Sequence, residues 1–331
     1  MSFTNTFDTT NTGSAVSNRE DLTDVLTILA PEETPILSSA DKKKASSTFV
    51  EWTVDSLAAP STSGISEGAD VTAFTDQFAG RAKLGNRVQK FRRDYMVSDM
   101  QEAVDSVGPA KIAQAEAKAI RELKRDIEAT LASANTQATE NGAGTANALG
   151  GLGDWIQNAA GSGNVPAAFQ TPAASVVDAG ATLSESEFNG LITSIFGVTG
   201  STNNLMLIAD TTLRSDISDF ARTTASATDN VRSVNYDGNS GQIKLSVDLY
   251  QSDHGVVSIV NGNPDCMPTQ GGTAGMMGYL VNPEYYGVHE LIPMGSTRLP
   301  NLGGGERGCV DCALTLGVYH PGAHGKIVDP S

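Results

Sequence analysis

The chain has 331 residues, of which 22 are basic and 38 acidic, so its formal net charge is −16. Such an acidic chain is a poor candidate for binding nucleic acid over its whole surface, because phosphate binding needs clustered Lys and Arg. Its 3 cysteines exclude a disulfide framework and fit a reducing cytoplasm.

Residues 1–18 are polar and rich in Thr, Ser and Asn. They offer few apolar groups to offset the entropy of ordering, which predicts a disordered or extended arm, and they lack the pattern of a signal peptide. A short helix is expected from Arg19, capped by Asn18, until Pro31 stops it. The two prolines of residues 31–35 predict an extended segment.

Residues 48–54 and 86–98 are strand candidates with β-branched and aromatic side chains. Roughly 30 residues rich in Pro, Ser, Gly and acids separate them, which is far more than the two to five residues usual in a hairpin loop. The pair therefore predicts a long two-stranded arm that projects from a body.

The clearest local pattern is a helix over residues 108–135. Pro109 suits the first helical position. One apolar stripe recurs at spacings of three and four, at Ile112, Ala115, Ala119, Ile120, Leu123, Ile127, Leu131 and Ala134. The opposite face is expected to carry Lys111, Lys118, Arg121, Lys124, Arg125 and Glu128. The predicted length of roughly 40 Å suggests a spine.

The rest of the chain mixes short helices and strands. Residues 141–181 are expected to be largely irregular, and residues 271–278 flexible. Helices are expected from Ser184 or Ser186 through Phe196 and over 213–222. Strands are expected over 204–209, 242–250, 256–260 and 279–291, with a final strand over 312–319. The elements lack βαβ regularity, so the fold class is α+β.

Two motifs could indicate chemistry, and neither has the required context. Gly64-Ile-Ser-Glu-Gly68 matches a nucleophile elbow, but that motif needs a strand before Ser66 and a helix after it. Cys309 and Cys312 have metal-knuckle spacing, yet residues three apart on a strand face opposite sides. His320 and His324 are separated by a Pro-Gly pair and are expected in a solvated loop. No catalytic residue, cofactor or metal site is predicted.

Basic residues concentrate in one place. Six of the 22 fall within 13 positions: Arg81, Lys83, Arg87, Lys90, Arg92 and Arg93. This basic cluster is either a solvated strand face or a surface that meets an acidic neighbouring subunit. Nucleic-acid binding is the weakest interpretation, because no aromatic interleaving or recognised motif accompanies the charges.

The order of elements resembles the Hong Kong 97 fold of tailed-phage major capsid proteins. Several phrases are similar to the capsid-protein group named after phage phi-SU ten: Pro31-Glu-Glu-Thr-Pro35, Glu51-Trp-Thr-Val-Asp-Ser-Leu57, Glu67-Gly-Ala-Asp70, Glu122-Leu-Lys-Arg-Asp-Ile-Glu128, Gly150-Gly-Leu-Gly-Asp-Trp155, Tyr250-Gln-Ser-Asp-His-Gly-Val-Val and Leu314-Thr-Leu-Gly-Val-Tyr-His-Pro-Gly-Ala-His324. These phrases span residues 31–324.

The resemblance implies an N-terminal arm at 1–40, an extended loop with its flanks at 41–106 and a spine helix at 107–136. It also implies an axial domain at 182–278 and a peripheral domain made from 137–181 and 279–331. Some relatives cross-link Lys to Asn, and Lys83 and Lys90 could offer the amine. No motif indicates the partner Asn, so no cross-link is predicted.

The implied function is a major capsid protein that assembles in the host cytoplasm into an icosahedral virion shell of hexamers and pentamers. The extended loop of one subunit would lie over the next, and the shell would enclose double-stranded DNA without sequence-specific binding. The resemblance also implies portal, scaffolding or decoration partners, with any scaffolding protein separate, and no membrane association. The alternatives are an encapsulin-like compartment, another phage structural protein and a hydrolase built on Ser66.

Overall fold

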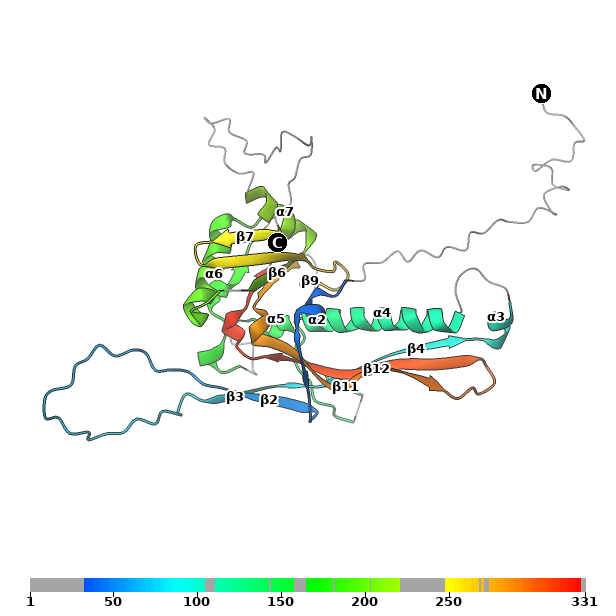
Figure 1. Ribbon diagram of the computed structural model, residues 1–331, viewed down its shortest axis with the longest axis horizontal. Helices are drawn as coiled ribbons and strands as arrows, with labels where there is room; N and C mark the ends of the chain where they lie inside the picture. The colour runs from blue at the N-terminus through cyan, green and yellow to red at the C-terminus, as the bar shows by residue number, and fades with distance from the viewer. Residues whose placement is uncertain are drawn as a thin grey trace, which may run out of the picture.

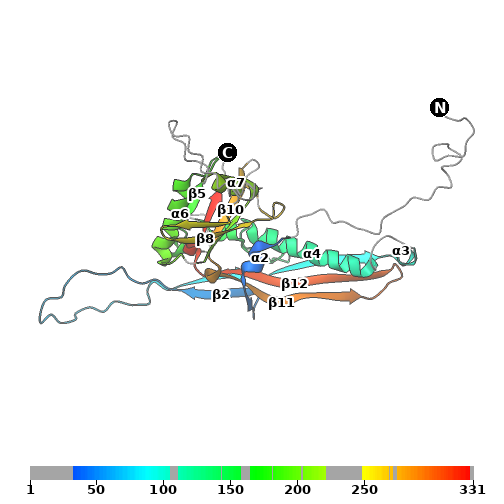
Figure 2. The ribbon, with the colours of Figure 1, turned by 45° about the horizontal axis from the view of Figure 1, so that its top comes forward.

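The computed structural model describes residues 33–104, 111–142, 144–157, 165–180, 182–202, 204–220, 248–267, 269–270 and 274–328. They form an elongated layer of sheet and helix, a rounder body above one end of it, and a thin arm (Figures 1 and 2). The expected N-terminal arm at 1–18 and the helix from Arg19 lie outside the described residues.

The elongated layer contains a four-stranded sheet in the order β1-β11-β12-β4. Its strands are β1 (Asp41–Lys44), β4 (Gln89–Val97), β11 (Tyr286–Leu299) and β12 (Glu306–Val318). Strands β11 and β12 form a long antiparallel hairpin, and β4 pairs antiparallel with β12. The short β1 pairs parallel with β11. The sheet thus gathers segments from three distant parts of the chain.

Helix α4 (Lys111–Ala132) lies along this sheet (Figure 2). Leu123, Ile127 and Leu131 are fully buried, because the apolar stripe faces the strands. This confirms the predicted spine helix over the described residues, although it ends at Ala132 and not at Asn135. Residues 108–110, including Pro109, lie outside the described part of the chain.

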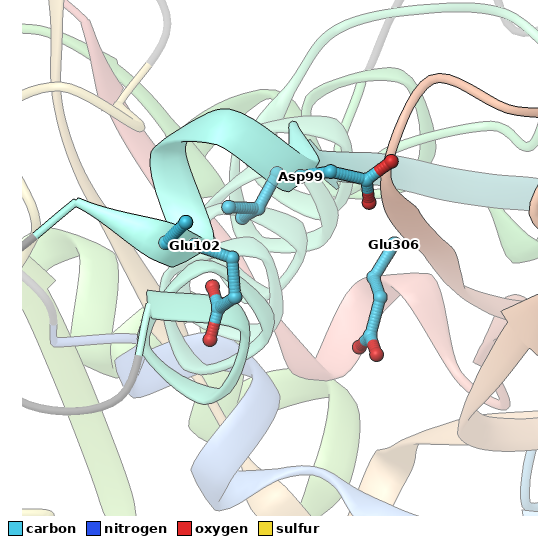
Figure 3. A pocket seen from close by; sticks show the side chains of 5 residues that line it. Asp99, Glu102 and Glu306 are labelled. Carbon is cyan, nitrogen blue, oxygen red and sulfur yellow. The ribbon is translucent and has the colours of Figure 1, made fainter.

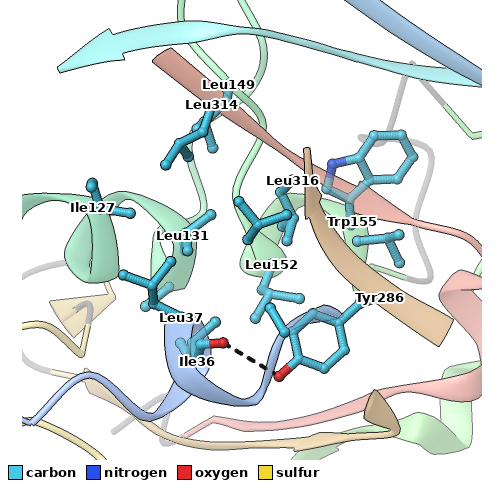
Figure 4. Close-up of a cluster of buried hydrophobic side chains, with 14 of the residues drawn as sticks. Ile36, Leu37, Ile127, Leu131, Leu149, Leu152, Trp155, Tyr286, Leu314 and Leu316 are labelled. Carbon is cyan, nitrogen blue, oxygen red and sulfur yellow. Dashed lines mark hydrogen bonds between the residues drawn. The ribbon is translucent and has the colours of Figure 1, made fainter. Parts of the chain in front are cut away.

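One hydrophobic core lies between α4, β11 and β12, together with the short helices α2 (Pro35–Ser39) and α5 (Leu152–Trp155) (Figure 4). The Tyr286 hydroxyl donates to the Ile36 carbonyl over 3.5 Å. Helix α2 and strand β1 were absent from the sequence prediction. Pro35 begins α2, as suits the first turn of a helix, instead of only extending the chain.

The rounder body holds the second sheet and a second hydrophobic core. The sheet follows the order β5-β13-β10-β6-β8-β7, with β9 beside β10. Its strands are β5 (Val176–Asp178), β6 (Leu205–Ala209), β7 (Leu249–Ser252), β8 (Gly255–Asn261), β9 (Thr269–Gln270), β10 (Ala274–Val281) and β13 (Gly325–Val328). Strands β5 and β13 come from ranges assigned above to the peripheral domain, so the expected boundaries cut through this sheet.

Helices α6 (Glu185–Thr199) and α7 (Thr211–Phe220) pack on the second sheet. Ser184 begins α6 through a capping box with Glu187, and Gly200 ends it in the left-handed conformation at φ 68°. Of the two caps considered, Ser184 is therefore the one used. Most of the strand expected over 242–250 lies outside the described residues.

The arm is the antiparallel pair β2 (Phe49–Val54) and β3 (Ala82–Arg87), joined by an exposed connection over residues 55–81. It extends away from the body on the side opposite α3 (Asp99–Ala103) (Figure 1). A projecting two-stranded arm is thus confirmed. The prediction of a single strand over 86–98 is wrong. The strand is interrupted at Val88, and its two parts, β3 and β4, belong to different sheets.

Three further expectations near the C-terminus are wrong. Residues 274–278, expected to be flexible, belong to β10. The strand expected over 279–291 is interrupted at Asn282, whose side chain accepts a hydrogen bond from Glu284 N and starts a turn over Pro283–Tyr285. The strand around 312–319 is not the last, because β13 follows it. Other short turns cover Ala167–Phe169, Ala173–Ser175 and Pro321–Ala323.

Candidate interaction surface

The root of the arm is anchored to the body by Asn86 on β3, which is fully buried. Its side-chain NH2 donates to the carbonyls of Gly150 at 2.9 Å and Leu316 at 2.8 Å. Its side-chain oxygen accepts from the N–H of Gly150 at 2.8 Å. All the hydrogen-bonding capacity of the amide is used, which holds the arm at one angle to the body.

Aromatic packing supports the same root. The Trp52 ring on β2 lies 5.5 Å from that of Trp155 and 6.0 Å from that of Tyr319, edge-on to the latter. These rings connect the arm to α5 and to the end of β12. The arm is therefore fixed where it leaves the body.

The basic cluster is divided between the arm and the body. Arg81, Lys83 and Arg87 lie on the arm, at or next to β3. Lys90, Arg92 and Arg93 lie on β4, which is an edge strand of the four-stranded sheet. The cluster is thus a band along the chain from the arm's root to the body, and only part of it projects.

Three members of the basic cluster have partners within the subunit. Arg81 pairs with Asp55 at 3.0 Å across the base of the loop. Lys90 pairs with Asp311 at 3.0 Å. Arg93 binds both carboxylate oxygens of Asp126 on α4, at 2.5 and 2.7 Å, and this pair raises the pKa of Arg93. These three charges therefore also support the subunit's own fold.

The other three members are Lys83, Arg87 and Arg92. The Arg87 guanidinium lies over the Phe49 ring, 5.0 Å from its centroid. Among the residues that the structure describes, none of the three forms an ion pair within the subunit. They are the members available to an outside partner.

The loop at residues 55–80 has the opposite character. It contains Asp55, Glu67, Asp70 and Asp76 and no Lys or Arg. Its apolar side chains face solvent, with Leu57 100%, Phe74 91% and Ile65 88% exposed. Large apolar side chains that are this exposed would gain free energy from burial against a partner. These exposed apolar side chains were not predicted from the sequence, whose composition in this stretch indicates a polar connection.

Ser66 lies in this exposed loop, and its carbonyl accepts from the N–H of Ala69 in a turn. Neither a preceding strand nor a following helix flanks Ser66, so the structural context of a nucleophile elbow is missing. Among the described residues, no three or more His, Cys, Asp or Glu side chains are arranged to hold a metal ion. No helix in the same residues is long and apolar enough to cross a membrane.

Cys312 is buried in the core beside Val310 and Leu314, and Cys309 lies at the other face of β12 and is half-buried. The predicted opposition of the two thiols is confirmed. The expectation of solvated histidines is wrong. His324 is fully buried, accepts from Asn282 N at 3.2 Å and has its pKa lowered to about 4 by desolvation, while burial also lowers the pKa of His320.

At the far end of β4, three carboxylates line a surface hollow of about 310 Å³ (Figure 3). They belong to Asp99, Glu102 and Glu306. An acidic cluster by itself does not make a cation site, and in Figure 3 the carboxylates of Glu102 and Glu306 point downward while that of Asp99 points to the right, so the three do not converge. The hollow carries no functional assignment.

A buried carboxylate was missed at Glu128, which the helical pattern placed on the solvent face. It is 1% exposed and accepts from the backbone N–H groups of Ile36 and Leu37. Desolvation raises its pKa to about 7, against the lowering effect of these two hydrogen bonds. Ala132, one turn further along α4, is also fully buried, so this side of the helix is covered, and no local sequence pattern indicates it.

The chain matches the family model for the SU10 major capsid protein over residues 3–331. No curated protein sequence matches it significantly. Among solved structures, the capsid of Cyanophage P-SCSP1u is similar, with a TM-score of 0.64, 12% identity and 100% coverage of both chains. The capsid of the native GTA particle gives 0.62 at 10% identity, covering 98% of this chain and 99% of that one. Mycobacterium phage Bobi gives 0.60 at 10% identity, with 96% and 97% coverage. At these identities the structural likenesses establish the fold.

Proposed function

Because the chain belongs to the SU10 major capsid protein family, we propose that its copies form the hexamers and pentamers of an icosahedral shell around double-stranded DNA. The protein is a major capsid protein of a tailed phage, with a Hong Kong 97-type α+β fold, and is a structural part of the virion and not an enzyme. The observation that carries the proposal is the family match over residues 3–331. It favours this function over a cargo compartment, another phage structural protein or a Ser66 hydrolase.

The fold supports a division of labour within the subunit. The four-stranded sheet with α4 would form the peripheral part, and the seven-stranded sheet the axial part around the symmetry axis of each capsomer. Strands β5 and β13 pair with β10, so they would go with the axial part. The arm would reach a neighbouring copy, with contacts of the heterologous kind that close into rings.

The basic cluster is the proposed intersubunit surface. Its free members, Lys83, Arg87 and Arg92, would meet acidic groups of a neighbouring copy, since complementary charge sets register between subunits. We further propose assembly in the host cytoplasm with portal and separate scaffolding or decoration proteins. An acidic subunit would hold the enclosed DNA without sequence-specific contacts.

Electron microscopy and sedimentation of the purified full-length protein test the proposal. Closed shells or capsomer-sized rings are the expected result, with a scaffolding protein added where the subunit alone stays soluble. A protein that remains monomeric under all of these conditions would contradict self-assembly.

A further inference from the structure

The arm and the strand that follows it, β4, carry the two charge signs in separate blocks. Residues 55–80 include 4 acidic side chains and no basic one, whereas residues 81–93 include 6 basic side chains and no acidic one. The acidic block forms the loop at the tip of the arm, and the basic block runs along β3 and β4 toward the body (Figure 1). The arm is therefore polarised from tip to root.

Within one subunit, the acidic and basic blocks form an ion pair with each other only where they adjoin, among the described residues. Arg81 and Asp55 pair where the loop begins and ends. Glu67, Asp70 and Asp76, further out, form no ion pair with any residue that the structure describes. The arm extends away from its own β4, so one subunit cannot bring its loop onto its own root (Figures 1 and 2).

We infer that the acidic loop at residues 55–80 of one subunit binds a basic surface of a second copy, here called the root, which consists of Lys83 and Arg87 on β3 and Arg92 on the adjoining β4. This inference rests on the proposed self-assembly and names the partner surface within it. Each copy offers one loop and one root, so the contact runs head to tail, and a closed ring satisfies every copy.

Exposed apolar side chains favour the loop at residues 55–80, over other acidic surfaces of the chain, as the partner of the root. The loop presents Leu57 and Phe74, which are 100% and 91% exposed. Past Arg92 on β4, the root surface continues to Met96, which is 56% exposed and lies beside the turn that carries Leu302, which is 81% exposed. Both partners thus combine charge of one sign with uncovered apolar groups, as interfaces do.

Some neighbouring groups oppose the contact, and one other interpretation exists. Glu51 lies opposite Gly85 on the arm, between Lys83 and Arg87, and Asp94 follows the root on β4. The alternative is that Arg92 and its neighbours keep the open edge of β4 from pairing with other strands. That interpretation requires no partner loop, so it predicts no effect of charges in the loop.

A charge swap separates the two interpretations. The loop variant is Glu67→Lys, Asp70→Lys and Asp76→Lys, and the root variant is Lys83→Glu, Arg87→Glu and Arg92→Glu. The swap variant carries all six changes and keeps the net charge of the natural chain. A control matched to the loop variant places the same charge change on exposed carboxylates outside the arm, with Glu140→Lys, Asp178→Lys and Asp253→Lys.

Particle yield is measured by sedimentation at about 0.1 M salt, where charges are screened over about 10 Å, and circular dichroism checks each subunit. We expect the loop variant and the root variant each to lose about tenfold or more in yield, and the swap variant to recover most of it. The control should assemble like the natural chain.

Two results would overturn the inference while leaving the proposed function intact. One is normal assembly of both triple variants, and the other is loss of assembly in both with no recovery in the swap. Because the changed loop side chains are exposed, the loop variant should fold normally. If the root variant misfolds, Lys83→Gln, Arg87→Gln and Arg92→Gln replaces it, and weakened assembly is again expected. Failure of the natural chain to form particles would instead count against the proposed function.

Discussion

The carboxylate of Glu128, in the middle of the spine helix, holds the backbone N–H of Ile36 at 2.8 Å. Its second oxygen holds the N–H of Leu37 at 2.9 Å. One buried side chain thus caps the first turn of α2. The same contact attaches α2 to α4. A helix of five residues has little stability of its own, so its position depends on this contact and on core packing.

Replacing Glu128 with Ala should destabilise the unassembled subunit by about 2–4 kcal/mol, because two buried N–H groups lose their acceptors. Denaturant unfolding measures the change. Glu122→Ala is the matched control on the same helix, since Glu122 is half-exposed and forms a surface ion pair with Lys118, so it should cost less than about 1 kcal/mol. Equal losses in the two variants would show that the Glu128 contact contributes nothing specific.

Glu128 should also make stability depend on pH. Burial raises its pKa from 4.5 to about 7, so the folded subunit binds this proton more tightly than the unfolded chain. The contribution is complete below pH 4.5 and is lost as pH rises through 7, by up to about 3 kcal/mol. Glu128→Gln cannot titrate. Its stability relative to the natural chain should therefore improve steadily from pH 4.5 to 8, and a constant difference would refute the assignment.

His324 should act in the opposite direction. Its pKa is lowered from 6.5 to about 4, because the ring is buried, accepts from Asn282 N and would be costly to charge. The stability contribution is present above pH 6.5 and is lost as pH falls toward 4. His324→Gln keeps an acceptor for Asn282 and removes this titration. Thermal unfolding from pH 7 to 4 should show less acid destabilisation in the variant than in the natural chain.

The hydrogen bonds of Asn86 predict a mechanical role at the root of the arm. Asn86→Ala would leave buried partners on Gly150 and Leu316 unsatisfied, at a cost of about 2–4 kcal/mol. The effect should be local as well as global, so hydrogen exchange of the β2 amides should accelerate more than that of α4. Lys83→Ala, an exposed change on the same strand, is the control. Unchanged exchange in β2 would show that the aromatic packing of Trp52 suffices.

The sequence predicted what depends on local periodicity. The stripe through Leu123, Ile127 and Leu131 identifies α4, because residues three and four apart share a face of any helix. Strand β1 could not be predicted, since all four residues of Asp41–Lys44 are charged and exposed, and only its pairing with distant β11 makes it a strand. The burial of Glu128 likewise depends on α2, some 92 residues away in the chain.

The same distinction applies to the proposed interaction surface. The clustering of basic residues is visible in the sequence, but the partners of Lys90 and Arg93 are set by the pairing of β4 with β12 and by its packing on α4. The interruption between β3 and β4 at Val88 could not be predicted for the same reason. A continuous strand-like pattern does not reveal that the chain passes from one sheet to another, because that transition depends on tertiary pairing.

The last prediction concerns the apolar side chains of the loop, and it separates assembly from folding. Leu57 and Phe74 contact no core in the single subunit, so the double change Leu57→Ser and Phe74→Ser should alter the unfolding free energy by no more than about 0.5 kcal/mol. If both side chains become buried on a neighbouring copy, each contributes about 1.5–3 kcal/mol to every contact. Repetition around a closed shell multiplies that loss, so particle yield should fall sharply.

Sedimentation for particles and denaturant unfolding for subunits are measured on the same preparations. Leu123→Ser serves as the contrasting control, because Leu123 is fully buried in α4 and its loss should destabilise the subunit itself. Normal particle yield from the Leu57 and Phe74 variant would show that these side chains remain solvated after assembly. A marked loss of subunit stability would place them in the fold of the single chain, since a side chain without contacts cannot contribute to folding.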